Sequence, residues 1–245
     1  MNTKALTCLL ATTALATLTA CGGGGDSETG SAEGIWGGTT STGEITALIV
    51  LPDGETWGIY GDETDASAGI LQGNITSNGG AVSGTLLDFN LTGTGQSSVG
   101  ISGTVRSRSA MNLVIASRAT LNMGYDSSYD VPASLTSMAG TYSGSAFGLG
   151  GVDETARVII SGTTITTGSV DYPTCVGAGT VSLRPGNKAV VDFSIRFNGS
   201  SCLVPDNTTI NGVAQYYPST GEITAIGLNS GRTQGVMMLA SRLVR

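Results

Sequence analysis

The sequence contains no histidine, and other catalytic side chains are scarce. Without imidazole, Ser-His-Asp and Cys-His catalysis are excluded, as are metal sites built on histidine. Lys188 is the only lysine after residue 20, and no Ser-x-x-Lys motif leads to it, which excludes that type of serine nucleophile. We therefore predict a non-catalytic protein with no cofactor and no metal site.

Charged and aromatic residues are also few, at 12% and 5% of the chain. The charged fraction is about half of the roughly 25% usual in soluble proteins. A formal net charge of −7 leaves no basic surface to neutralise phosphates, so nucleic acid is excluded as a partner. Glycine supplies 38 of 245 residues, and low charge with plentiful Gly, Thr and Val favours short strands joined by turns.

Hydrophobic runs are short everywhere except at the N-terminus. The first twenty residues, MNTKALTCLLATTALATLTA, place Lys4 before an apolar stretch that ends in small residues. This layout is typical of a secretory signal, so residues 1–20 are predicted to be a signal peptide. The stretch is too short and too rich in threonine for a spanning helix, which needs about 20 predominantly apolar residues.

The end of this segment, Leu18-Thr19-Ala20-Cys21, resembles the lipobox of bacterial lipoproteins. The resemblance implies that Cys21 carries lipid, that the mature chain begins there, and that the protein is anchored in the cell envelope. Because Gly22 stands where an aspartate would retain the protein at the inner membrane, the resemblance favours the outer membrane. Residues 21–33 read as a flexible Gly-rich tether, and an ordinary secretory signal with a chance cysteine is the alternative.

Two cysteines remain in the exported part of the chain, Cys175 and Cys202. An oxidising compartment favours a disulfide between them, which would stabilise the fold by roughly 3–4 kcal/mol in the chain-entropy model. Two unpaired buried thiols are the alternative. A zinc site is disfavoured because the sequence offers no histidine and no second cysteine pair.

The chain repeats one sequence pattern twice. GIWGG at 34–38 returns as GTYSG at 140–144, LLDFNL at 86–91 resembles VVDFSIRF at 190–197, and MNLVIASR at 111–118 returns as VMMLASR at 236–242. We predict an all-β fold of two tandem antiparallel meanders, each a small β-barrel or sandwich. The expected modules span residues 34–118 and 140–245, with a connector at 119–139. A membrane-spanning barrel is disfavoured because aromatic girdles are missing.

Trp57, Tyr60 and Tyr217 are the candidate ligand-binding residues, because aromatics on a strand face can contact sugars or a protein partner. Trp57 and Tyr60 are three residues apart and should point to opposite faces of a strand. Trp36 is expected in the core. The acidic stretch at 53–65 reads as two solvated turns around a strand, with a calcium loop or a carboxylate pair as alternatives.

The tether followed by Gly-rich modules that open with GIWGG or GTYSG resembles transferrin-binding-protein-like and factor-H-binding-like surface lipoproteins. This resemblance implies a protein-binding surface on a rigid barrel. Our leading hypothesis is a non-catalytic envelope lipoprotein that binds a protein, glycan or small apolar ligand. The alternatives are a purely structural envelope protein or a carboxylate-based polysaccharide hydrolase, whose candidate acids are Asp53, Glu55, Asp62, Glu63, Asp88 and Asp192.

Overall fold

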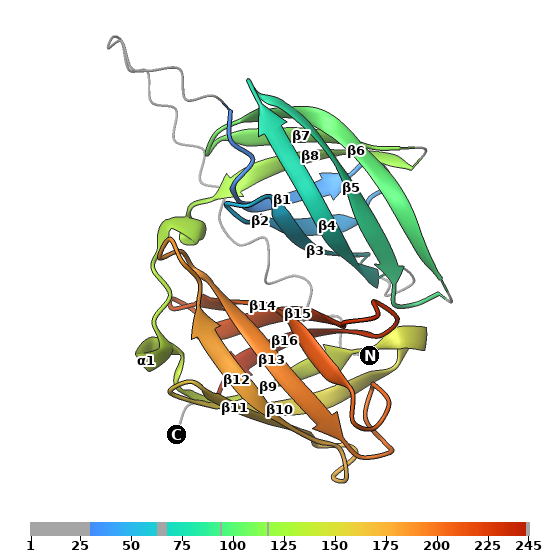
Figure 1. Ribbon diagram of the computed structural model, residues 1–245, viewed down its shortest axis with the longest axis vertical. Coiled ribbons are helices and arrows are strands. Elements are labelled where there is room, and N and C mark those ends of the chain that lie inside the picture. Colours follow the sequence, from blue (N-terminus) through green and yellow to red (C-terminus); the bar gives the residue numbers. More distant parts are fainter. Residues whose placement is uncertain (1–29, 63–67, 94, 117, 244–245) are drawn as a thin grey trace.

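The computed structural model describes residues 30–62, 68–93, 95–116 and 118–243, which form two closed antiparallel β-barrels (Figure 1). The expected all-β fold of two tandem modules is confirmed, and both modules are barrels. Each barrel has eight strands in up-and-down order and closes where its first strand pairs with its last. Barrel 1 comprises β1 (Gly34–Thr40), β2 (Ile45–Val50), β3 (Glu55–Gly61), β4 (Ala68–Asn78), β5 (Ala81–Asn90), β6 (Gln96–Arg106), β7 (Ala110–Ile115) and β8 (Ala119–Asp126). Barrel 2 comprises β9 (Gly140–Phe147), β10 (Asp153–Ser161), β11 (Thr164–Ser169), β12 (Val176–Leu183), β13 (Val190–Asn198), β14 (Thr209–Tyr217), β15 (Glu222–Asn229) and β16 (Gly235–Arg242).

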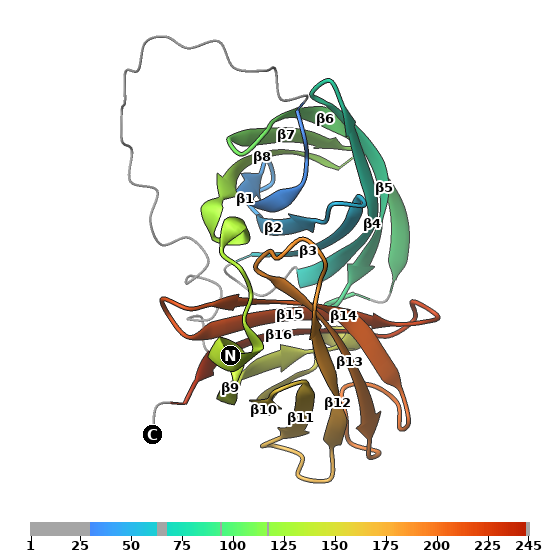
Figure 2. The same ribbon diagram turned by 60° about the vertical axis from the view of Figure 1, so that its left-hand side comes forward.

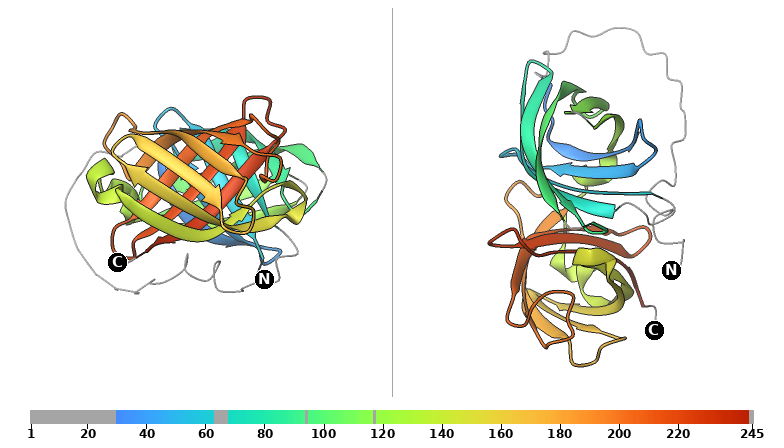
Figure 3. Two further views of the ribbon diagram at one scale, coloured as in Figure 1. Left: turned by 90° about the horizontal axis from the view of Figure 1, so that it is seen from below. Right: turned by 90° about the vertical axis from the view of Figure 1, so that its right-hand side faces the viewer.

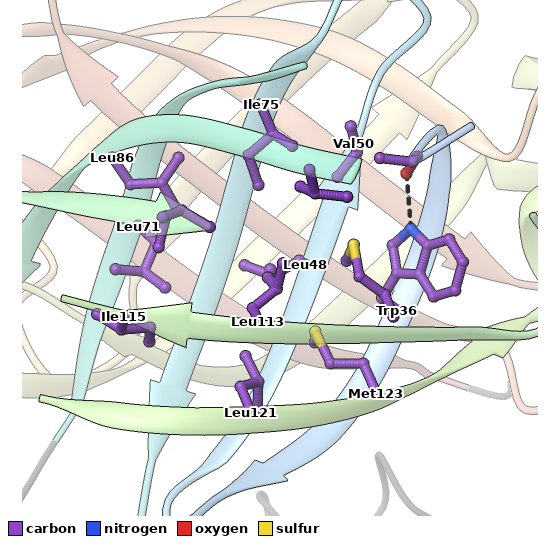
Figure 4. Close-up of a cluster of buried hydrophobic side chains, with 14 of the residues drawn as sticks. Trp36, Leu48, Val50, Leu71, Ile75, Leu86, Leu113, Ile115, Leu121 and Met123 are labelled. Carbon is purple, nitrogen blue, oxygen red and sulfur yellow. Dashed lines mark hydrogen bonds between the residues drawn. The ribbon is translucent and has the colours of Figure 1, made fainter. Parts of the chain in front are cut away.

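Alternating residue types fill the barrel interiors. In β10 every second residue is buried, because successive side chains of a strand point to opposite faces. Barrel 1 is filled in the same way by aliphatic side chains from β2, β4, β7 and β8, including Leu48, Leu71, Leu113 and Leu121 (Figure 4). The interior of each barrel is therefore a hydrophobic core.

The aromatic residue of the repeated opening motif has the same role in both barrels. Trp36 is fully buried, and its Nε1 donates a hydrogen bond to the Ala32 carbonyl at 2.8 Å (Figure 4). Tyr142 is fully buried as well, and its hydroxyl donates to the Met138 carbonyl at 2.6 Å. Each ring thus anchors the segment four residues before it over one end of its barrel, and the expected core position of Trp36 is confirmed.

The last glycine of the motif lies at the seam where each barrel closes. A Cβ at Gly38 would be 2.0 Å from the carbonyl oxygen of Asn122 in β8, and one at Gly144 would be 2.0 Å from that of Leu239 in β16. No side chain fits at such distances from a hydrogen-bonded backbone. The first and last strands can therefore approach this closely only because both positions are glycine.

The end of the first module differs from the expectation. Residues 119–126, assigned to the connector, form β8, whose alternating Ala119, Leu121 and Met123 are buried. MNLVIASR consequently falls on the seventh strand of barrel 1, whereas VMMLASR falls on the eighth of barrel 2. The shared Ser-Arg ending of the two motifs therefore does not mark equivalent positions. Barrel 1 has a further strand, β8, which pairs with β1 to close the barrel.

A third hydrophobic cluster joins the two barrels, and Figure 2 shows β3 of barrel 1 lying over β14 and β15 of barrel 2. Outward side chains of β2, β3 and β4 pack against outward side chains of β14, β15 and β16, and the barrels lie one on the other (Figure 3). This interface cluster contains Ile35, Ile49, Leu51, Trp57, Ile59, Ile70, Phe89, Leu91, Tyr129, Val190, Val213, Ile226, Leu228 and Met237. The two modules therefore have separate cores and share a third.

The connector contains the 3-10 helix η2 (Ser127–Asp130) and the short helix α1 (Leu135–Met138). It is tied to barrel 2 by the Ala189 amide, which donates to the Tyr129 carbonyl at 3.0 Å, and by the Lys188–Asp130 ion pair at 2.8 Å. Within the described residues, no helix has the length and apolar character needed to cross a membrane.

The predicted disulfide is present. Cys175 and Cys202 are bonded, with their Cα atoms 4.8 Å apart. The bond joins the segment before β12 to the segment between β13 and β14, so it fixes two connections at one end of barrel 2.

Candidate ligand-binding site between the barrels

A pocket of about 330 Å³ lies where β3 of barrel 1 meets β12, β13 and β14 of barrel 2. Its polar lining from barrel 2 consists of outward positions on neighbouring strands. Ser194 is in direct cross-strand register with Thr180 on one side and with Asn211 on the other. Hydroxyl and amide groups from three strands therefore form one continuous polar patch.

Arg184 joins the two barrels across this pocket. Its Nη2 donates to Glu55 Oε2 of barrel 1 at 2.8 Å, and its Nη1 lies 3.2 Å from Asp192 Oδ1 of barrel 2. The contact with Asp192 is an ion pair whose geometry is not that of a hydrogen bond. Nη1 is buried, and within the described residues it has no hydrogen-bond acceptor. With both carboxylates ionised, one guanidinium between them leaves the pocket with a formal charge of −1.

Trp57 forms an apolar part of the wall and positions the acid of barrel 1. Its Nε1 donates to Glu55 Oε1 at 2.9 Å, while the other oxygen of Glu55 accepts from Arg184. The ring itself is only 6% exposed, because most of it packs in the interface cluster. Trp57 therefore presents an edge to the pocket, and Glu55 is held in one orientation.

The surroundings of Asp192 raise the pKa of its carboxyl. Burial raises the pKa of Asp192, Arg184 acts in the opposite direction, and the negative charges of Glu55 and Asp53 raise it further. The carboxyl of Asp192 can thus serve as a hydrogen-bond donor more readily than a free aspartate. Arg184 faces this carboxyl, and its positive charge offsets only part of the effect of burial on the pKa of Asp192.

The remaining candidate acids do not join this pair. Asp53 is in the turn before β3, where its Oδ1 accepts the Glu55 amide at 3.0 Å. Asp88 is buried inside barrel 1, Asp62 follows β3, and Glu63 lies outside the described residues. Among the residues that the structure describes, no group of three or more Cys, Asp or Glu could hold a metal ion.

The three aromatic candidates are not brought together. Trp57 belongs to the interface cluster and Tyr60 to the core of barrel 1, which confirms that they point to opposite faces of β3. The Tyr60 hydroxyl donates to Asp88 at 2.7 Å. Tyr217 lies at the end of β14, where its hydroxyl donates to Gln215 at 2.8 Å, and Tyr216 points into barrel 2. Only Trp57 lines the pocket, and Cys21 lies outside the described residues.

Several pocket residues escaped the sequence-based analysis. Arg184 stands beside Pro185 and Gly186 and reads as an ordinary turn residue. Thr180, Ser194 and Asn211 look like ordinary outward strand positions. The sequence did offer one signal in β3, where the uncharged run TWGIYG follows Glu55, and the structure buries all of that run. A strand buried on both faces must contact something outside its own barrel.

Comparisons with known proteins assign the chain to no family. No protein-family model matches the chain, and a search of curated proteins finds no match. Among solved structures, it is similar to isotype 1 transferrin binding protein B from serogroup B Neisseria meningitidis, with 9% identity, a TM-score of 0.32, and coverage of 82% of this chain and 64% of that one. It is also similar to two mutants of transferrin binding protein B from Haemophilus parasuis Hp5, each with 7% identity, with TM-scores of 0.29 and 0.30 and coverage of 85% and 82% of this chain. The chain spans 64–66% of the length of these three structures.

Proposed function

We propose that this protein is a non-catalytic binding protein whose pocket between the barrels holds a neutral or basic saccharide unit. The supporting observation is the Glu55–Arg184–Asp192 bridge inside a pocket of about 330 Å³ lined by hydroxyl and amide groups. Sugar hydroxyls need closely spaced donors and acceptors, and this pocket supplies both, with the edge of Trp57 as its apolar wall. The net negative charge of the pocket disfavours acidic sugars.

The rigid junction between the barrels supports the same proposal. Both ends of the Arg184 bridge rest on strands whose opposite faces are buried in hydrophobic cores. A polar site supported in this way is preorganised, so little conformational entropy is lost when a ligand binds.

Titration of the full chain with a panel of neutral, amino and acidic oligosaccharides, followed by calorimetry or NMR, tests this proposal. Ser194→Ala and Asn211→Ala should each weaken binding two- to tenfold, since one hydrogen bond contributes about 0.5–1.5 kcal/mol. Thr166→Ala is the matched control, because Thr166 is an exposed position of β11 away from the pocket.

The outcome of this titration also separates the alternatives. Cleavage of a bound oligosaccharide that is lost in Asp192→Asn would establish the hydrolase instead. If no saccharide binds, and loss of the protein disturbs envelope integrity, a purely structural role replaces binding.

We further propose that lipid on Cys21 tethers the barrels to the outer membrane through the residues before Ser31, since Ala32 is already part of the core of barrel 1. Several acyl chains give a lasting anchor, at about 0.8 kcal/mol per buried methylene, whereas one chain holds only marginally. Palmitate labelling should modify the wild-type chain, and Cys21→Ala should abolish both the label and partitioning into detergent. An unlabelled wild-type chain would refute the anchor while leaving the proposed pocket untouched.

A further inference from the structure

The interior of barrel 2 contains a second cavity, separate from the pocket between the barrels. It has a volume of about 60 Å³ and is lined almost entirely by apolar side chains, among them Ala146, Ala156, Phe197 and Met238. Since roughly 10–15 Å³ suffices for one water, this space admits a molecule of about four or five non-hydrogen atoms.

Glu154 is the one acidic group that lines this cavity. It is the first inward residue of β10 and only 7% exposed. Ser169 hydrogen-bonds its carboxyl, and the Ser169 Oγ in turn accepts the Tyr172 amide at 3.0 Å. The Oε2 atom of Glu154 is buried, and within the described residues it has no hydrogen-bond partner.

The buried acid of barrel 1 shows how unusual this arrangement is. Asp88 is equally buried, but it forms an ion pair with Arg118 and accepts the Tyr60 hydroxyl at 2.7 Å. No basic side chain in the described part of the chain forms an ion pair with Glu154. A buried carboxyl that lacks such a partner is expensive for the fold, and a bound cation would relieve that cost.

The surroundings of Glu154 favour a positively charged partner. Burial raises the pKa of Glu154, its bond from Ser169 lowers it, and the nearby negative charge of Asp171 raises it. Two acidic groups therefore gather at this end of barrel 2. The disulfide Cys175–Cys202 holds the adjoining segment in place, and the next residue, Leu203, lines the cavity.

We propose that barrel 2 binds a small primary alkylamine, with its ammonium group on Glu154 Oε2 and its alkyl stem against the apolar walls. The ammonium donates to the unpartnered oxygen, and the stem displaces water from the cavity. This site is distinct from the saccharide pocket, because Phe193 is the one residue that lines both.

Titration of the full chain with n-propylamine, which has four non-hydrogen atoms, tests the proposal by NMR. The methyl signals of Ala146 and Ala156 should shift, and 1-propanol, of the same size but without the charge, should bind about tenfold more weakly or not at all. Hexylamine should be excluded by its length. Glu154→Gln keeps the size of the side chain and removes its charge, so affinity for propylamine should fall about tenfold or more. Asp153→Asn is the matched control on the outward face of the same strand and should leave binding unchanged.

A second variant keeps the carboxylate and fills the space. Ala156→Val should abolish propylamine binding while the barrel stays folded, as shown by an unchanged far-UV spectrum. The proposal is overturned if propylamine binds equally well to Glu154→Gln or Ala156→Val, or if the Ala146 and Ala156 methyl signals do not respond. A crystal structure grown with propylamine in which Oε2 contacts only ordered water would overturn it as well.

Discussion

Replacing Gly38 with alanine tests whether closure of barrel 1 depends on the repeated glycine. A Cβ at this position would lie 2.0 Å from the carbonyl oxygen of Asn122 and 2.9 Å from its carbonyl carbon. Both atoms belong to the backbone of β8, which is hydrogen-bonded on both sides, so they cannot rotate away as a flexible side chain would. The seam between β1 and β8 must therefore open locally to admit the methyl group.

The expected cost combines two effects. Overpacking in a closed core costs about 1–3 kcal/mol, and each backbone hydrogen bond lost at the seam adds roughly 0.5–1.5 kcal/mol. We expect Gly38→Ala to lower the free energy of unfolding by about 2–4 kcal/mol. Gly37→Ala is the matched control, because a Cβ at Gly37 would meet nothing within 4 Å. That variant should be neutral or more stable by about 0.4–1 kcal/mol, since alanine restricts the unfolded chain.

Urea unfolding followed by tryptophan fluorescence measures both variants. Trp36 and Trp57 are the only tryptophans of the chain, so a Trp57→Phe background leaves Trp36, in the core of barrel 1, as the single reporter. If Gly38→Ala and Gly37→Ala unfold at the same urea concentration, the close approach at the seam does not limit stability. The explanation of the repeated motif would then fail for Gly144 as well.

Three further predictions concern buried groups. Replacing Cys175 and Cys202 with serine should destabilise barrel 2 by about 3.5 kcal/mol, the chain-entropy value for their separation of 27 residues, with no shift of the Trp36 fluorescence transition. Arg118→Met should cost about 2–4 kcal/mol in urea unfolding because it leaves Asp88 buried without its cation, and adding Asp88→Asn should recover part of the loss. Because the pKa of Glu154 is raised, the folded state binds its proton more tightly than the unfolded state does. The ionised group therefore destabilises the fold at a pH above its folded pKa. This destabilisation disappears as the pH falls below the unfolded pKa. Glu154→Gln should therefore be more stable than wild type at pH 7 by thermal unfolding, and an equal difference at pH 3.5 would contradict this assignment.

Much of the fold follows from local patterns in the sequence. The tight turns, the alternation within strands and the exported cysteine pair predicted an all-β chain of two modules and the disulfide. The opposite orientation of Trp57 and Tyr60 followed from strand geometry alone. The sequence analysis missed strand β8, although Ala119, Leu121 and Met123 alternate with polar residues. The motif ending in Ser-Arg, which recurs near the end of the second module, suggested that the first module ended at residue 118.

The candidate site was less accessible because it depends on how the barrels dock. Glu55 and Arg184 are far apart in the sequence, and no local rule brings them together. The docking is encoded in outward apolar side chains such as Ile59 and Ile226, which read as core residues of a single barrel. Such docking buries both faces of a strand, as it does along β3 after Glu55 and in β14 from Gly212 to Tyr216.

The two barrels keep one architecture and differ in their buried charge. Both barrels close in the same way. Trp36 and Gly38 in barrel 1 correspond to Tyr142 and Gly144 in barrel 2. In barrel 1 the buried Asp88 is paired with Arg118 and accepts a hydrogen bond from Tyr60, so its charge is compensated within the barrel. Barrel 2 leaves its own acid facing a cavity, and an incomplete group of this kind persists only at a cost in stability. Both proposed ligand sites use residues of barrel 2, one inside it and one where it meets barrel 1. We therefore expect barrel 1 to act mainly as a rigid support for these sites.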